Sequence, residues 1–372
     1  MEVLRVRYRL SVEPAEAEAR AEAIALEQTV EVPRVAVRDA FIEREILGRV
    51  EAVAHTTDGA SLATIAYPLT ALTGDPAQFL GVLFGNTSLH RDVECVDFDA
   101  PESLLAAFGG PRFGLDVWRD RTGVRDRALT CTAVKPLGHT PKALAEMLRT
   151  FATAGIDVVK DDQGLADHSF CPFEERVRTC LAAADEMADT TGKRVLYVPN
   201  LIGTPERVLA QLRFAEEQGA RAVMVAPMLL GLPFFQELCQ RHASVPVMAH
   251  PSLGGAARFA PELLFGKLLR AFGADAVIFV GYAGRFGVPR EACATIARDL
   301  RAPWAGLRPS LPVPGGGIEV DTASEAVAFY GRDAMLLVGG SLQVEEGALQ
   351  ERSRAFVSAV HQSDPRAPEE RT

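Results

Sequence analysis

The sequence predicts an α/β protein in which a smaller ferredoxin-like α+β domain precedes a C-terminal (β/α)8 TIM barrel. From about residue 128, short β-branched apolar runs alternate with amphipathic helical stretches, and this unit recurs eight times. The first 120 or so residues instead mix alternating strand patterns with two helices. No GxGxxG motif follows an early strand, which disfavours the runner-up, an open doubly wound sheet.

The N-terminal domain is predicted over residues 1–122. LRVRYRLSV (4–12) alternates as a strand, and PAEAEARAEAIALEQTV (14–30) reads as a helix. Further strands are predicted over 48–57, 63–72 and 93–101, with a helix or buried segment over 78–86. The segment PRFGLDVWRDRTGVRDR (111–127) is predicted as a polar connector to the second domain.

The barrel is predicted over residues 123–362. Its helices open with proline or a capping residue and mostly close at glycine, as PKALAEMLRTFATAG does. The charged, proline-containing tail 363–372 is predicted to be disordered. The eight predicted barrel strands are 128–135, 155–160, 194–199, 222–226, 245–250, 275–280, 311–313 and 334–338.

Composition excludes several classes of partner. The formal net charge of −10 disfavours nucleic acid and anionic membranes, and no run of eighteen apolar residues predicts a membrane span. The N-terminus lacks the apolar core of a secretory signal. The six cysteines form no CxxC pair, which indicates reduced core residues and a cytoplasmic protein. We therefore expect a small-molecule ligand.

Barrel enzymes carry their chemistry at the carboxyl ends of the strands, and there two lysines stand out. Lys135 and Lys160 end neighbouring strands and should share one cavity. Such a lysine can transfer protons, form a Schiff base, or take up CO2 as a carbamate that binds metal. Because strand residues alternate, Asp162 should face inward with Lys160, and Asp161 outward. The plainer alternative is a buried ion pair between Lys160 and Asp162.

Glycine pairs follow the seventh and eighth strands. Gly316 and Gly317, then Gly339 and Gly340, could present bare backbone amides to a phosphate, or simply form tight turns. His250 ends the fifth strand and could act as an acid or base, or be a satisfied core histidine.

Taken in order, these motifs resemble the RuBisCO large-subunit superfamily. They are KP at Lys135, GIDVVKDD ending at Asp162, GRFG at 284–287, GGGI at 315–318 and the final glycine pair. The resemblance extends to LEQT (26–29) and FGNT (84–87), and it points to the form IV, RuBisCO-like proteins, which do not fix carbon. It implies Mg²⁺ and a homodimer whose active site is shared between subunits.

The resemblance also implies roles for individual residues. Glu27 and Asn86 would act from the partner subunit, with Asn86 contacting the metal or an oxyanion. Lys135 would be the protonating group, and Arg285, where the family has a flexible-loop lysine, would clamp a substrate carboxylate. Asp162, carbamylated Lys160 and Gln163 would hold Mg²⁺.

Departures from the family pattern narrow the substrate. KPLG lacks the second lysine of KPKLG, and Gln163 replaces a charged metal ligand, so Mg²⁺ affinity should fall. Pro251 and Ile278 replace cations that grip a distal phosphate. An unpaired dianion there would cost several kcal/mol, so we expect one phosphate or carboxylate, held by the two glycine pairs.

These residues suit enediolate chemistry on a sugar-derived keto compound, without CO2 fixation. The KPLG loop (135–138) and the KDDQGLAD string (160–167) most resemble the branch of the family that decarboxylates an oxidised branched sugar acid, 3-oxo-isoapionate or its 4-phosphate, which would make the protein a lyase. The alternative is an isomerase or enolase on a methylthio sugar phosphate in methionine salvage, because Ile278 and Pro251 could receive the methylthio group. A non-catalytic binding protein is a third alternative, disfavoured by the two costly lysines.

Overall fold

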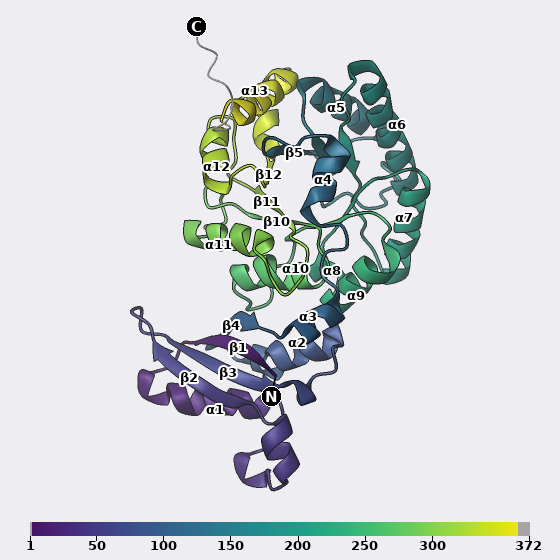
Figure 1. The fold of residues 1–372 in the computed structure, drawn as a ribbon. Coiled ribbons are helices and arrows are strands. Elements are labelled where there is room, and N and C mark those ends of the chain that lie inside the picture. Colours follow the sequence, from purple (N-terminus) through teal and green to yellow (C-terminus); the bar gives the residue numbers. More distant parts are fainter. Residues whose placement is uncertain (1, 364–372) are drawn as a thin grey trace.

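The computed structural model describes residues 2–363 and contains a four-stranded antiparallel sheet and an eight-stranded parallel barrel (Figure 1). Both predicted architectures are confirmed. Only Ser363 of the predicted tail 363–372 belongs to the described residues. Within residues 2–363, no helix has the length and apolarity needed to cross a bilayer.

The N-terminal sheet has the strand order β2-β3-β1-β4, which is the ferredoxin-like order. Alternation along β1 produces two faces: Leu4, Val6, Tyr8 and Leu10 are buried in one core with α1, and the arginines between them lie on the other face. The elements are β1 (Val3–Leu10), α1 (Ala17–Glu27), β2 (Arg49–His55), β3 (Ser61–Pro68), α2 (Pro76–Phe84), β4 (Val93–Asp99) and α3 (Glu102–Phe108).

The predicted polar connector is in fact partly helical and partly buried. Helix α4 (Gly114–Thr122) lies across the barrel (Figure 1), and Leu115 and Trp118 join the core inside it. Asp275 fixes the start of this helix, because its Oδ1 accepts hydrogen bonds from the backbone nitrogens of Phe113 and Gly114 at 2.8 and 2.7 Å. The prediction of a polar connector was wrong. The segment is rich in charged residues, and the apolar residues of the helix form a single narrow stripe, which is the part that is buried.

All eight predicted barrel strands are present, most of them shorter than predicted. The sheet order runs β7-β6-β5-β12-β11-β10-β9-β8, and a bridge between Asn200 and Met224 joins its two ends. Two backbone hydrogen bonds of Met224, to Pro199 and Leu201, complete that closure. The strands are β5 (Leu129–Val134), β6 (Val158–Asp161), β7 (Leu196–Val198), β8 (Val223–Val225), β9 (Val247–Ala249), β10 (Ala276–Val280), β11 (Leu311–Gly315) and β12 (Met335–Leu337).

Helices surround the barrel (Figure 1), and their ends follow capping rules. Thr140 and Thr204 cap α5 and α7 by accepting backbone N–H bonds, and Gly155 ends α5 in a left-handed conformation. The helices are α5 (Pro141–Ala154), α6 (Phe173–Thr191), α7 (Pro205–Glu217), α8 (Pro227–Leu230), α9 (Leu232–Glu237), α10 (Leu269–Ala271), α11 (Arg290–Arg301), α12 (Ala323–Tyr330) and α13 (Leu349–Gln362). A π-helical segment, η7 (Glu262–Leu268), precedes α10.

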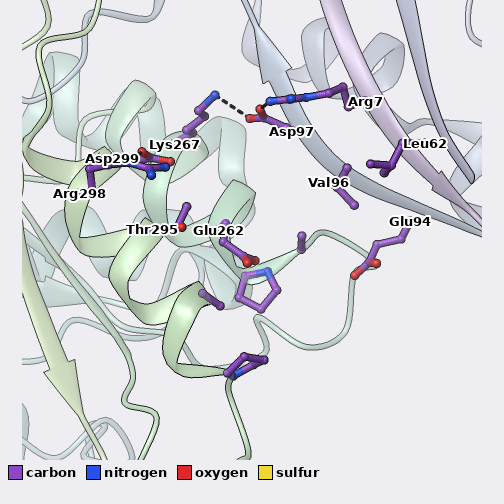
Figure 2. A pocket seen from close by; sticks show the side chains of 14 residues that line it. Arg7, Leu62, Glu94, Val96, Asp97, Glu262, Lys267, Thr295, Arg298 and Asp299 are labelled. Atoms are coloured by element: carbon purple, nitrogen blue, oxygen red, sulfur yellow. Dashed lines mark hydrogen bonds and ion pairs between the residues drawn. The ribbon is translucent and has the colours of Figure 1, made fainter. Parts of the chain in front are cut away.

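The open face of the N-terminal sheet points toward the barrel helices η7 and α11 (Figure 2). Asp97 of β4 pairs with Arg7 on its own sheet and with Lys267 of η7, whose Nζ lies 2.6 Å from the carboxylate. Cys95 adds two backbone hydrogen bonds at 3.0 Å, to Arg258 and Ala260. These contacts hold the small sheet against its own barrel.

Candidate active site

Lys160 lies deep in the barrel mouth. It is inward-facing on β6, where it pairs in register with Ala133 of β5, and only 2% of the residue is exposed. Its Nζ donates one hydrogen bond, to the backbone oxygen of Asp161 at 3.1 Å. Burial lowers the pKa of the Lys160 ammonium, and the positive charge of Lys135 adds to this effect. The environment therefore favours the neutral amine.

Lys135 follows the end of β5 and pairs with Asp162, its Nζ lying 3.3 Å from the carboxylate. Asp162 thus faces the mouth, as the alternation along the strand predicts. An ion pair between Lys160 and Asp162 was the plainer alternative from the sequence. In the structure Asp162 pairs with Lys135 instead. Both partners are partly exposed, so the charged pair borders solvent at the rim, above the buried amine of Lys160.

His250 follows β9, and its tautomer is fixed by its neighbours. Its Nδ1 accepts a hydrogen bond from the backbone nitrogen of Ser252 at 3.2 Å, so the proton of the neutral ring lies on Nε2. Burial lowers the pKa of His250 to about 3, with further contributions from Lys160 and Lys135. At neutral pH this side chain is an uncharged hydrogen-bond donor.

The first glycine pair follows β11 and packs on the loop after β10. Gly316 and Gly317 have φ of +77° and +80°, a conformation that favours glycine. A Cβ on Gly317 would lie 2.2 Å from the carbonyl carbon of Ala283, so only glycine fits there.

The second pair, Gly339 and Gly340, follows β12 and begins a short 3-10 helix, η8 (Gly340–Gln343). A Cβ on either residue would meet no heavy atom within 4 Å, so this backbone borders open space. Both pairs lie where a phosphate-binding site was predicted.

Apolar side chains line the barrel interior beneath the glycine turns. Ile278 of β10 is 3% exposed and packs in one cluster with Val313 of β11 and Leu337 of β12. This sector carries no fixed cation at Ile278, in contrast to the sector around the two lysines.

Within the described residues, three predicted site residues make no hydrogen bond or ion pair with the two lysines. Arg285 is exposed, and its guanidinium lies over the Phe286 ring at 5.0 Å. Asn86 donates to Glu27 at 3.0 Å, so these two residues meet each other. Glu27 ends α1, which covers the sheet face turned away from the barrel helices.

The unmodified side chains do not fit Mg²⁺. Asp162 is a carboxylate that faces the mouth beside two lysines, and it is already paired with Lys135. Within residues 2–363, no three His, Cys, Asp or Glu side chains are grouped as a metal site. Gln163 adds an uncharged amide, which hard cations prefer less than a carboxylate. A carbamate on Lys160 would change this donor set by replacing an amine with two oxygens.

Sequence reasoning gave no role to the residues that fix the β6–α6 loop. Asn200, two residues after the end of β7, donates to the backbone oxygens of Gln163 and Leu165, both at 3.0 Å. Its place at a strand end was the signal that could have identified it. Arg176, within α6, gave no comparable signal.

Two sizeable cavities lie away from these residues. One of about 570 Å³ separates the N-terminal sheet from η7 and α11 (Figure 2). Another, of about 470 Å³, lies between α6 and the loop that enters β8. Neither is lined by a predicted site residue, whereas Lys135, Lys160 and Asp162 meet at the barrel mouth, which is therefore the candidate site.

Comparison with known proteins identifies the family. Residues 114–259 match the family described as "Ribulose bisphosphate carboxylase large chain, catalytic domain". The chain is 41% identical to a Rhodospirillum rubrum protein named 5-methylthioribulose-1-phosphate isomerase, over 96% of each chain. It is 34% identical to 2,3-diketo-5-methylthiopentyl-1-phosphate enolase of Geobacillus kaustophilus, over 81% of this chain and 75% of the relative.

A solved structure extends the likeness to the whole fold. The crystal structure of a Rubisco-like protein from Rhodopseudomonas palustris superposes with a TM-score of 0.91 and 38% identity, covering 99% of this chain and 100% of the other.

The comparisons correct one prediction from the sequence. The two curated relatives are named as an isomerase and an enolase, so the predicted decarboxylation of a branched sugar acid, and with it the lyase class, is wrong. The substitutions at Pro251 and Ile278 indicated that cations binding a second substrate phosphate are missing. They did not indicate which chemical group of the substrate lies there instead. With its barrel, its ordered motifs and these relatives, the chain belongs to the RuBisCO large-chain superfamily, among the RuBisCO-like proteins.

Proposed function

We propose that this protein moves a proton next to the carbonyl of a methylthio-substituted sugar phosphate, as an isomerase or enolase. The observation that carries the proposal is the meeting of Lys135, Lys160 and Asp162 at one mouth that also bears two bare glycine turns. The names of the relatives supply the substrate class. The isomerase is favoured over the enolase, because that relative is more similar and matches more of the chain.

The substrate phosphate would bind at the glycine turns. Backbone N–H groups of Gly316, Gly317, Gly339 and Gly340 can converge on an anion without obstruction by a Cβ. This places the single dianion near β11 and β12 and leaves the carbonyl to reach toward β5 and β6.

Proton transfer would use the difference between the two lysines. Burial lowers the pKa of Lys160, so its amine can accept a proton from the carbon next to the carbonyl. The Lys135 ammonium, next to Asp162, can return a proton to the neighbouring carbon. His250, through its Nε2–H, can stabilise the developing oxyanion.

The methylthio group would lie near Ile278 of β10 and Pro251 after β9. These two residues offer a surface without charge where a second phosphate would be left unpaired. This accounts for a substrate with a phosphate at one end and a thioether at the other.

We further propose a homodimer in which Glu27 and Asn86 complete the partner's barrel mouth. Large apolar side chains are exposed on both surfaces that would meet. Those of the N-terminal domain near Glu27 and Asn86 are Val32, Val35, Phe41, Ile42 and Leu89. Those of the barrel loops are Leu137, Phe170, Leu229, Leu253, Phe286 and Val344. Burying such patches would stabilise association.

The test is turnover of purified protein with 5-methylthioribulose 1-phosphate and, separately, with 2,3-diketo-5-methylthiopentyl 1-phosphate in D2O. A new sugar phosphate isomer, or its enol, should appear with solvent deuterium at one carbon. Failure to process either compound, or to exchange its α-protons, would reject the proposal.

A further inference from the structure

We propose that Asp161, Arg176 and Asn200 are positioning residues, which aim Lys160 and Asp162 by fixing the loop between β6 and α6. The proposal rests on the proposed function for its catalytic consequence. None of the three is expected to touch substrate, because Asp161 and Arg176 lie behind the strand and Asn200 is hydrogen-bonded to the loop backbone.

Asp161 is the outward-facing carboxylate between the two inward-facing residues, and it is fully buried. Its oxygens accept three hydrogen bonds: from Arg176 Nε at 2.9 Å, from the Tyr197 hydroxyl at 2.7 Å and from the backbone nitrogen of Asn200 at 3.0 Å. A buried charge is tolerated only with such partners. The end of β6 is therefore anchored on the side opposite to Lys160.

Arg176 connects this anchor to the far side of the loop. It lies on α6 with no exposed side-chain surface, and its Nη1 donates to the backbone oxygens of Ala166 at 2.8 Å and Cys171 at 3.3 Å. One guanidinium thus binds the strand before the loop and two points along it. Its fixed fork geometry makes these contacts mutually dependent.

Asn200 holds the start of the same loop from β7. Its side-chain nitrogen binds the oxygens of Gln163 and Leu165, directly after Asp162. Between them, Arg176 and Asn200 bind four backbone oxygens over residues 163–171, so Asp162 is carried on a segment with little freedom to shift. Its carboxylate is thereby held 3.3 Å from Lys135 Nζ.

This arrangement separates chemistry from binding. The scaffold supports β6 and its loop, whereas the phosphate would bind after β12 and β11, two and three strands away in the sheet. Loosening the scaffold should therefore lower kcat and leave KM nearly unchanged, because small misplacements of reacting groups cost far more in rate than in affinity.

The experiment compares two buried arginines. Arg176→Met removes the scaffold, and Arg270→Met is the matched control. Arg270 is equally buried and also binds backbone oxygens, those of Ala302, Leu307 and Arg308 among them, but on the outer side of the barrel. Arg176→Lys retains the positive charge, and Asn200→Ala tests the loop separately should Arg176→Met fail to fold.

Arg176→Met should lower kcat by about 10- to 100-fold with KM within about twofold, and Arg176→Lys should recover part of that loss. Arg270→Met should lower the thermal midpoint without this change in kcat. A second readout needs no substrate: labelling of Lys160 by an amine reagent, followed by mass spectrometry, should quicken roughly tenfold in Arg176→Met and not in Arg270→Met.

Equal losses of kcat and equal Lys160 labelling in the two methionine variants would overturn the proposal. If the wild-type protein processes neither substrate, the proposed function fails. The labelling comparison then decides the positioning proposal on its own.

Discussion

The buried amine of Lys160 costs stability in exchange for a reactive group. It is 2% exposed and donates a single hydrogen bond, to Asp161 O, so part of its hydrogen-bonding capacity is unmet. Active sites commonly retain such groups at the expense of folding free energy.

Lys160→Met should therefore abolish turnover and leave the protein at least as stable as the wild type. We expect a loss of activity of about 10²- to 10⁴-fold, the usual contribution of a general base. We expect the free energy of unfolding, measured by urea denaturation, to stay level or rise by about 1 kcal/mol. A marked fall in stability would show that Lys160 is instead a structural cation.

The lowered pKa of His250 predicts how the free energy of unfolding depends on pH. Its pKa in the folded state, about 3, lies below the value near 6.5 of the unfolded chain. Between these values the unfolded chain binds a proton that the folded protein excludes, so acidification favours unfolding by up to about 1.4 kcal/mol per pH unit. The contribution of the neutral His250 ring to the free energy of unfolding is fully present above pH 6.5 and is lost as the pH falls toward 3.

His250→Asn should flatten that acid limb. Denaturant unfolding from pH 7 to pH 4 should show a smaller loss of stability in the variant than in the wild type. Asp275 acts in the opposite direction, because burial raises its pKa to about 6 and its protonation below that pH favours the folded state. Asp275 is present in both proteins, so the difference between them isolates His250. Parallel pH profiles would contradict the assignment.

At the scale of elements, the first glycine turn links the proposed phosphate site to the β10–α11 loop. Gly281 donates to the backbone oxygen of Gly315 at 2.8 Å, and Gly317 is packed against the backbone of Ala283 and Gly284. The loop that carries Arg285 therefore rests directly on the turn. Arg290, at the other end of that loop, lies 4.8 Å from the Tyr282 ring and 4.7 Å from that of Phe329.

Gly317→Ala should weaken phosphate binding more than Gly316→Ala. Both residues have positive φ, so each alanine carries a backbone strain of about 1–2 kcal/mol. Only at position 317 does the new Cβ also meet backbone atoms, at 2.2 to 2.5 Å, and displace the loop. Competitive inhibition by inorganic phosphate measures the effect. Equal inhibition constants in the two variants would indicate that the turn does not hold the anion.

The sequence was informative where periodicity fixed a side chain's direction. Lys160, Asp161 and Asp162 alternate as predicted, because a strand allows only two faces. The sequence was misleading where a charge-rich segment buries a narrow stripe of apolar side chains. Trp118 of α4 belongs to such a stripe. Nor could the sequence show that Arg176 reaches back to Asp161, since that pairing depends on how α6 packs against β6.

At the scale of the whole molecule, the N-terminal domain is fixed in an orientation that keeps Glu27 away from its own barrel mouth. Asp97 binds Lys267 across the domain boundary, and the sheet presents its arginine-bearing face to η7 and α11 (Figure 2). Glu27 and Asn86 pair with each other elsewhere on the domain. If these two residues take part in the reaction, a second subunit must receive them.

That requirement predicts complementation between two inactive variants. Glu27→Gln and Lys160→Met should each lose activity as homodimers. A heterodimer, however, pairs the intact Glu27 of one chain with the intact Lys160 of the other. Random mixing on co-expression gives heterodimers in half of all pairs, each with one complete site in two, so about a quarter of wild-type activity should return.

Co-expression of Lys135→Met with Lys160→Met is the control, because both changes lie in the barrel and every site then lacks one lysine. This pair should stay inactive. Absence of activity in the Glu27→Gln and Lys160→Met mixture would place Glu27 outside a shared site and leave each barrel to act alone. Recovery of activity in the control would show that complementation does not report where Glu27 acts, and would remove the support for a shared site.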